Sequence, residues 1–210
     1  MLLFGVEYFL ALVIAFFDNK KNRKIILVLL IIFTLLFAFR NITMNKPGDI
    51  EVYRYYYENI HDSAVVNRSN FELGYYFLNI VFSFLRLPFG ALQVAIGIFF
   101  TVIMWKCFDY YTKYPGVCLL ASLFFLFYYA TGALRQSITI PIAFYAFRYL
   151  TEADIEHGKR LLNIVDVKRR NLIKYFITCS ILFLFHGAAI FLFLLPALKS
   201  RKGKIIILAA

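Results

Sequence analysis

Long apolar stretches follow one another along the chain, with polar interruptions between them. They fall near residues 2–17, 25–39, 72–87, 91–108, 117–130, 134–150 and 175–198, and carry few or no charges. Their lengths approach the ~20 residues that cross the hydrocarbon core of a bilayer. The apolar positions are continuous and do not alternate as they do in a half-exposed strand. The pattern predicts an all-α fold, a polytopic transmembrane helical bundle of about seven apolar segments.

The chain reads as a single integral membrane domain over residues 1–210. No internal repeat or low-complexity tract divides it. After Lys204 a new apolar stretch begins and reaches Ala210, which is too short to cross a membrane. We expect this stretch to be the start of another span, and the chain to be the N-terminal part of a longer domain.

The longest polar interruption covers residues 40–71 and contains a second kind of helix. Asp49 follows Pro47-Gly48, a turn signal, and is suited to cap a helix. Apolar and aromatic residues then recur at helical spacing on one face: Val52, Tyr53, Tyr56, Tyr57 and Ile60. This predicts an interfacial amphipathic helix in the first outer loop, with its tyrosines at the depth of the lipid headgroups.

Charge gives the expected orientation. The net charge is +11, and basic residues cluster at 20–24, 159–174 and 199–204, beside apolar segments. Such clusters mark the cytoplasmic face and its anionic lipid headgroups, and no soluble domain is present to hold nucleic acid. If 175–198 is one span, the last two clusters lie on opposite sides of the membrane. A re-entrant segment between 72 and 130 is the arrangement we favour, because the segments there are short and contain breaks at Pro88 and Pro115.

Two polar groups stand inside the apolar segments. Arg135, followed by Gln136, lies between two apolar runs, and a charge at that depth is by default a functional candidate. Its guanidinium suits a diphosphate. His186 stands in the middle of the 175–198 run, where an imidazole needs a partner or a wet cavity. It is either hydrogen-bonded inside the bundle or a proton carrier or phosphate partner.

Three more candidates lie at the ends of segments. Arg40 closes the second segment and is either a snorkelling arginine or a phosphate ligand. Asp49 is a helix cap, a general base, or both. Glu72 stands where the chain re-enters the membrane, as an interfacial charge, a cap or a binding group. The chain has no P-loop, zinc-ligand spacing or nucleophile elbow, so we expect no cofactor and no metal ligands.

An ordered set of motifs resembles the EpsG family, the Wzy-like polymerases of bacterial exopolysaccharide and capsule clusters. The set is Arg40, then Gly48-Asp49 with Tyr53, then Phe71-Glu72-Leu73-Gly74-Tyr75, then Gly132-Ala133-Leu134-Arg135-Gln136-Ser137-Ile138, then Phe185-His186-Gly187-Ala188-Ala189. The resemblance runs from about residue 25 to 200, although family members are longer. The plan is also similar to that of GT-C glycosyltransferases.

The resemblance implies a multi-pass glycosyltransferase of the bacterial cell membrane that joins oligosaccharide repeat units carried on undecaprenyl diphosphate. Asp49, Arg135 and His186 would be catalytic, with Asp49 as the base or acceptor-orienting carboxylate. Arg40 and Arg135 would hold the diphosphate, while Tyr53, Glu72 and Gln136 would bind substrate. Other polysaccharide assembly proteins are possible partners. The alternatives are a transporter or flippase for a lipid-linked glycan, and a non-catalytic scaffold of a polysaccharide export complex.

Overall fold

The computed structural model describes residues 22–38, 49–68, 71–121, 133–150 and 169–199, with three single positions (9, 13 and 17) before them. The described part of the chain is helical and contains no strand, as predicted. The helices are α2 (Arg23–Ala38), α3 (Asp49–Glu58), α4 (Ser63–Arg68), α5 (Leu73–Phe84), α6 (Phe89–Tyr111), α8 (Leu134–Phe147), α9 (Arg169–Phe183) and the 3₁₀-helix η1 (Gly187–Lys199). A further helical segment begins at Pro115, where proline suits the first turn of a helix.

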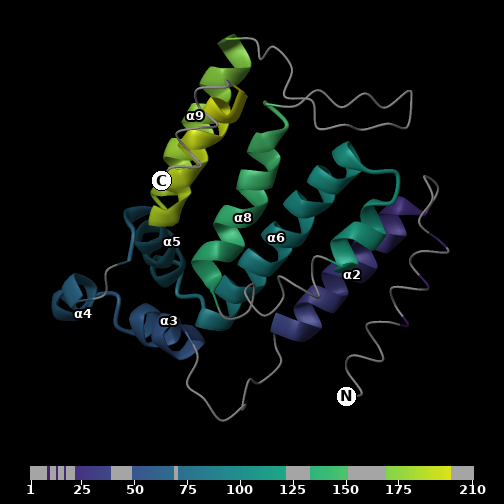
Figure 1. The fold of residues 1–210 in the computed structure, drawn as a ribbon. Coiled ribbons are helices and arrows are strands. Elements are labelled where there is room, and N and C mark those ends of the chain that lie inside the picture. Colours follow the sequence, from purple (N-terminus) through teal and green to yellow (C-terminus); the bar gives the residue numbers. More distant parts are fainter. Residues whose placement is uncertain are drawn as a thin grey trace.

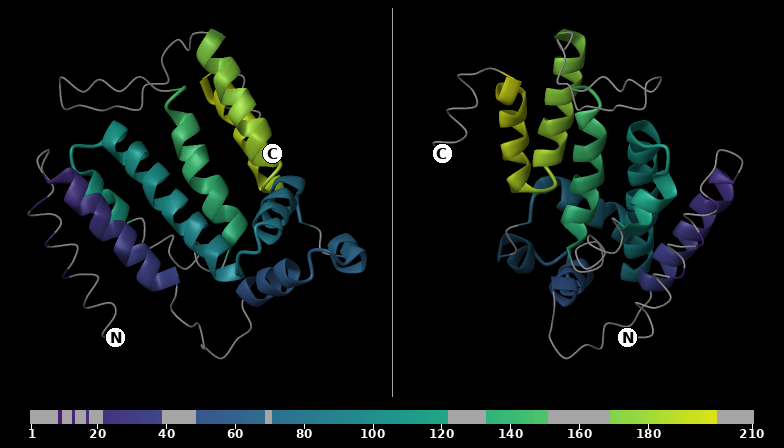
Figure 2. Two further views of the ribbon diagram at one scale, coloured as in Figure 1. Left: turned by 180° about the vertical axis from the view of Figure 1, so that it is seen from behind. Right: turned by 45° about the vertical axis from the view of Figure 1, so that its right-hand side comes forward.

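The long helices stand side by side in a row around α6. α6 packs against α2 on one side and α8 on the other, α8 packs against α9, and α9 against η1 (Figures 1 and 2). Phe100 and Met104 of α6 are fully buried against Ile26 and Leu30 of α2. At the other side of the row, Ala146 and Leu150 at the end of α8 meet Tyr175 and Cys179 of α9. The order in the row is therefore α2, α6, α8, α9 and η1.

The apolar run 175–198 is a hairpin, so the prediction of a single span there was wrong. α9 ends at Phe183, and after a short turn η1 runs back along it (Figure 1). The hydroxyl of Tyr175 donates to the carbonyl of Leu192 at 2.6 Å, and the rings of Phe176 and Phe193 stack at 5.8 Å. Arg169 and Lys199 consequently lie at the same end of the molecule.

α5 is too short to cross the row, and both of its ends lie against α3. Its 12 residues extend about 18 Å. Near its start, Tyr75 contacts Tyr53 of α3 with ring centroids 5.4 Å apart. Just after its end, the carbonyl of Leu87 accepts a 2.5 Å hydrogen bond from Tyr57. The turn between α5 and α6 includes Arg86 at a positive φ of 53°. α5 therefore lies beside α3 at one end of the row, and the prediction of a re-entrant segment between 72 and 130 stays a prediction.

The tyrosine face of α3 packs into the protein. The predicted helix is present, with Asp49 as its first residue and not as the residue that caps it. Tyr53, Tyr56 and Tyr57 are at most 7% exposed and belong to the core shared by α5, α6 and α8. Val52, predicted on the same face, is 59% exposed. The periodicity identified the buried face correctly, but its neighbours are Phe71, Tyr75 and Phe89. These tyrosines are therefore not a surface on which sugars stack.

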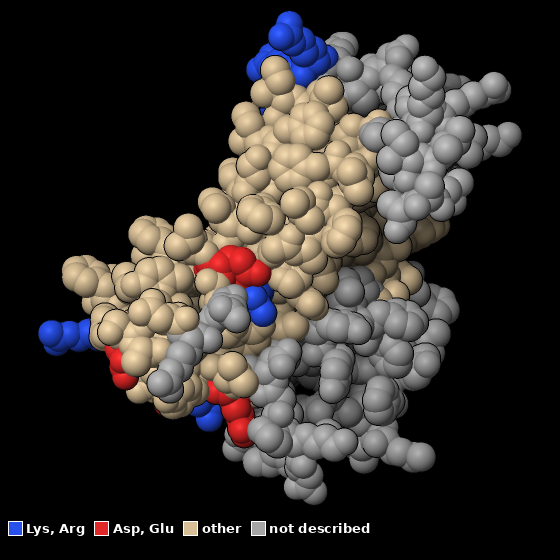
Figure 3. All heavy atoms as spheres, turned by 60° about the vertical axis from the view of Figure 1, so that its left-hand side comes forward, with Lys and Arg blue, Asp and Glu red and all other residues tan. Residues whose placement is uncertain are grey.

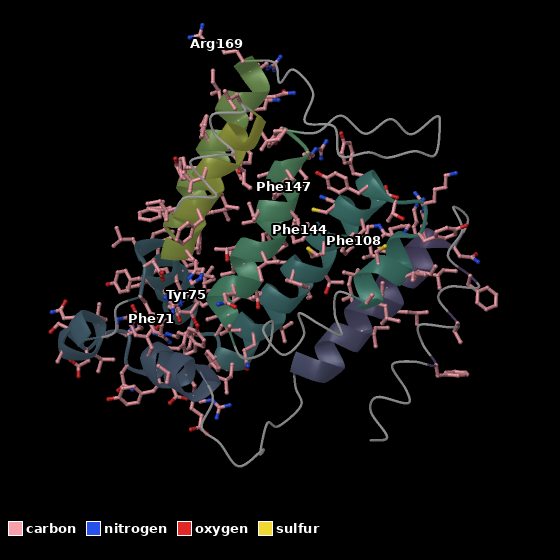
Figure 4. The ribbon with its side chains drawn as sticks, viewed as in Figure 1. Phe71, Tyr75, Phe108, Phe144, Phe147 and Arg169 are labelled. Carbon is pink, nitrogen blue, oxygen red and sulfur yellow. The ribbon has the colours of Figure 1, made fainter. Side chains whose placement is uncertain are left out.

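One described helix, Phe89–Tyr111, is long and apolar enough to cross a membrane, while Leu73–Phe84 and Gly187–Pro196 are shorter apolar helices. The predicted count of seven segments is not reached among the described residues. Figure 3 shows an uncharged surface between basic residues at one end and mixed charges at the other. Arg169 marks the first end, and Phe71 and Tyr75 lie at the opposite one (Figure 4).

Candidate functional site

Glu72 is the centre of a polar cluster at the end of the row where α3, α5 and α8 meet. It immediately precedes α5, in extended backbone conformation. Its Oε2 accepts a hydrogen bond from Nη1 of Arg135 at 2.6 Å, and its Oε1 accepts one from the backbone N–H of Gly187 at 2.9 Å. One carboxylate therefore joins the first turn of α8 to the first residue of η1.

Arg135 is held on three sides. Besides the ion pair, its Nε donates to the hydroxyl of Tyr53 at 3.3 Å. The guanidinium carbon lies 4.8 Å from the ring centroid of Phe71 and 5.9 Å from that of Tyr53, a cation–π arrangement. Nε and Nη1 are thus engaged, while Nη2 makes no hydrogen bond with any residue that the structure describes. Both side chains of the ion pair remain about one-fifth exposed, so the pair lies at the surface of the row and not in its core.

His186 lies in the turn between α9 and η1, and the prediction that it stands in mid-span was wrong. Its Nδ1 is 3.7 Å from Oε1 of Glu72, beyond hydrogen-bond distance, and has no partner among the described residues. The turn has backbone hydrogen bonds of its own, from Phe185 and His186 to Leu182, and is also bonded to residues 72–74. The backbone N–H of Gly74 donates to the carbonyl of Leu184 at 2.7 Å, next to the contact between Gly187 and Glu72.

The surroundings of Glu72 favour its charged form. Burial alone would raise the pKa of the carboxyl group, but the hydrogen bonds from Arg135 and from the Gly187 backbone, with the positive charge of Arg135, outweigh that effect and lower it. Glu72 is consequently a carboxylate at neutral pH and a weak base. This environment suits the orientation of a neighbouring cation better than the abstraction of a proton.

The other predicted site residues are placed less completely. Asp49 is the first residue of α3, one helical turn before Tyr53, which puts its backbone about 6 Å along the axis from a residue in contact with Arg135. The side chain of Asp49 is outside what the structure describes, and so is Arg40 altogether. Gln136 follows Arg135 on α8 and is half-buried, and its backbone carbonyl accepts from Thr139 at 3.3 Å.

Metal ligands do not gather at this site: within the described ranges, no group of three or more His, Cys, Asp and Glu side chains could hold a metal ion. The polar groups that do meet are one carboxylate, one guanidinium, one phenol and one imidazole. Such a set can bind an anion and move a proton.

Comparison with known proteins identifies the family. The model of the EpsG family matches residues 43–157, more than half of the chain. The chain belongs to the EpsG family. This membership indicates a polysaccharide-related membrane protein. No curated protein and no solved structure matches the chain.

The EpsG family model covers only part of the polar cluster. Tyr53, Glu72 and Arg135 lie inside the matched range, whereas His186 and Gly187 lie beyond it. Two contributors were missed by reasoning from the sequence, the Phe71 ring under Arg135 and Gly74 beside the turn. Both belong to the motif Phe71-Glu72-Leu73-Gly74-Tyr75, so the signal was present, but nothing local to the motif tells which residues it meets.

Proposed function

We propose that this EpsG-family protein is a membrane glycosyltransferase that polymerises oligosaccharide repeat units carried on undecaprenyl diphosphate. In the reaction, an acceptor hydroxyl attacks the anomeric carbon of the donor sugar. The bond from that carbon to the diphosphate oxygen breaks, undecaprenyl diphosphate leaves, and the hydroxyl proton passes to a base. The observation that carries the proposal is the position of Arg135, which Glu72, Tyr53 and Phe71 orient together.

The arginine fits the leaving group. A diphosphate departs as a polyanion, and fixed N–H donors aimed at its oxygens stabilise the transition state. A guanidinium presents parallel donors that match two phosphate oxygens. An arginine already held by its neighbours loses little further freedom when it binds, so its contribution goes to the reaction. His186, in the adjacent turn, is a second group suited to contact the phosphate.

Asp49 remains the proposed base, because the other carboxylate of the cluster is engaged. Glu72 uses both oxygens for Arg135 and Gly187, and its lowered pKa makes it a poor proton acceptor. Asp49 begins the helix that delivers Tyr53 to the same cluster. We therefore propose that the acceptor hydroxyl binds between the start of α3 and the diphosphate.

The ends of the helices support a multi-pass orientation. α6 and α8 each run away from the cluster, and α9 and η1 form a hairpin whose turn lies at the cluster. The basic residues at the start of α9 and the end of η1 then share the opposite end, as the positive-inside rule requires. We propose that the Glu72–Arg135 end faces the extracytoplasmic side. A re-entrant α5 and a hairpin at 183–187 remove the conflict between the basic clusters.

Cysteine labelling tests this orientation. In a Cys118→Ser background, Arg170→Cys and Lys199→Cys should both react with a membrane-impermeant maleimide only after the membrane is opened. Arg54→Cys, on the exposed face of α3, should react in intact cells. Cys107 and Cys179 are buried and give little background. Labelling of positions 170 and 199 from opposite sides would contradict the hairpin orientation.

The activity is tested with the protein in liposomes and a purified undecaprenyl-diphosphate-linked repeat unit. We expect a ladder of glycan lengths together with released undecaprenyl diphosphate. Asp49→Asn should lower the rate by about two to four orders of magnitude, because it removes the base and retains the shape. Glu51→Gln, an exposed carboxylate on the same helix, is the matched control and should stay within about twofold of the wild type.

Two outcomes would overturn parts of the proposal. Translocation of the lipid-linked unit without any ladder would indicate a flippase. Full activity of Asp49→Asn would remove Asp49 from the mechanism and leave the polymerase reaction intact.

A further inference from the structure

Residues 72–74 and the turn between α9 and η1 are joined by two hydrogen bonds, each donated by a backbone N–H. The N–H of Gly74 donates to the carbonyl of Leu184 at 2.7 Å, and the N–H of Gly187 donates to Oε1 of Glu72 at 2.9 Å. We call this pair of contacts the turn clamp. It connects Arg135, through Glu72, to a turn that lies about fifty residues further along the chain.

Gly74 is the position where the two backbones approach most closely. A Cβ at residue 74 would lie 2.8 Å from the carbonyl oxygen of Leu184 and 3.0 Å from two ring carbons of Phe185. The first contact is with backbone and cannot be relieved by rotating a side chain. Any other residue at this position therefore moves the turn away from α5. Gly90, at the start of α6, has nothing within 4 Å of its Cβ position.

The orientation of the Glu72 carboxylate depends on both of its partners. Oε1 is fixed by Gly187 and Oε2 by Arg135, so rotation of the carboxylate breaks one contact or the other. If the turn moves away, Glu72 loses the partner that holds Oε1, and Arg135 loses a fixed acceptor. Catalytic groups must be held to within a fraction of an ångström, and a displacement of about 1 Å can cost about 100-fold in rate.

We propose that Gly74 is a positioning residue for Arg135, acting through the turn 184–187 and Glu72. The identity of the ligand, a diphosphate, rests on the proposed function, whereas the positioning of Arg135 by Gly74 does not. It assigns to the hairpin turn, which lies outside the range matched by the family model, a part in forming the anion site. The site then requires residues 72–74, 135 and 184–187 together.

The first test compares Gly74→Ala with Gly90→Ala in lipid nanodiscs. The measured quantities are the dissociation constants of undecaprenyl diphosphate and undecaprenyl monophosphate. Gly74→Ala should weaken diphosphate binding about tenfold and monophosphate binding less, because the diphosphate carries more negative charge and gains more from an oriented guanidinium. Gly90→Ala should leave both constants unchanged. Equal weakening for the two lipids would overturn the inference, since a general loss of structure acts on both.

The second test is a double-mutant cycle with Arg135→Gln. If Gly74 acts through Arg135, Gly74→Ala should add no further loss of diphosphate affinity in the Arg135→Gln background. Additive losses would contradict the inference. Should Gly74→Ala not fold, Gly187→Pro replaces it in both tests. It deletes only the N–H that binds Glu72, at the first position of a helix, where proline is tolerated.

A third measurement separates this inference from the proposed function. The melting temperatures of the same four proteins are measured in the absence of undecaprenyl phosphates. Non-additive effects of Gly74→Ala and Arg135→Gln on the melting temperature then report the turn clamp alone. If the wild type binds no undecaprenyl diphosphate, the proposed function is refuted. If the melting temperatures nevertheless show coupling, the positioning of Arg135 by Gly74 is upheld. Absence of coupling in both measurements would refute the positioning role.

Discussion

Replacing Arg135 by glutamine should lower the rate of polymer formation by about two to three orders of magnitude, the range typical of losing one preorganised donor to a developing anion. Lysine should rescue little of this loss. Its ammonium cannot donate to Tyr53 and Glu72 in the directions that Nε and Nη1 use. The measurement is the initial rate of undecaprenyl diphosphate release in proteoliposomes. The loss should fall mainly on kcat, because the charge on the diphosphate grows as the bond breaks.

The matched control for Arg135 is Arg54→Gln. Arg54 also lies over an aromatic ring, 5.8 Å from the centroid of Phe89, but it is exposed and has no carboxylate partner among the described residues. We expect its rate to stay within about twofold of the wild type. An Arg135→Lys protein with full activity would show that charge alone suffices, and the oriented fork would then have no part in the reaction.

The hydrophobic pattern predicted the helices correctly where the signal comes from residues close together in the sequence. The α6 and α8 helices occupy the predicted segments 91–108 and 134–150 with small shifts at their ends. A helix begins at Asp49, after the Pro47-Gly48 turn signal. In each case the chain itself carries the information, because apolar spacing and turn residues act over a few positions.

The hairpin at 183–187 was not predictable from its own sequence. The run from Tyr175 to Leu198 is apolar throughout apart from a few small or polar residues, so its length alone indicated one span. Besides its own backbone hydrogen bonds, the turn is held by Glu72 and Gly74, which lie far away in the sequence. Pairings between residues more than a hundred positions apart leave no periodic trace. The same limit applies to α3. The helical spacing of its tyrosines was predicted correctly, but the tyrosines pack against other helices of the protein and not against lipid headgroups.

For the candidate site, too, the sequence predicted single residues but not the contacts between them. Arg135 and Glu72 stood out singly because charges are costly next to apolar segments. Their pairing at 2.6 Å, and the Phe71 ring beneath the guanidinium, required the fold. Sequence reasoning predicted each of them as a separate binding group. In the structure one of them orients the other, which changes the expected result of mutating Glu72.

Replacing Glu72 by alanine should lower both stability and activity. Removing one member of a buried pair leaves an uncompensated charge, which costs 3–5 kcal/mol in a dry interior. Because the two side chains are about one-fifth exposed, we expect about 2 kcal/mol here. Glu72→Gln should cost less stability, since its amide oxygen still accepts a hydrogen bond, but it should lose most of the activity. Thermal unfolding in detergent and the release assay measure the two effects.

The pH dependence provides the check on mechanism. The pKa of Glu72 is lower in the folded protein than its ordinary value of about 4.3, because the hydrogen bonds from Arg135 and Gly187 outweigh burial. The stabilisation from the ionised group is therefore complete above that ordinary value and is lost as the pH falls through the lower, folded value. The melting temperatures of wild type and Glu72→Gln should differ at pH 7 and converge only as the pH falls through the lowered pKa of the folded protein. A difference that persists unchanged into acid would mean that the carboxylate charge does not hold Arg135, and the ion pair would then contribute packing alone.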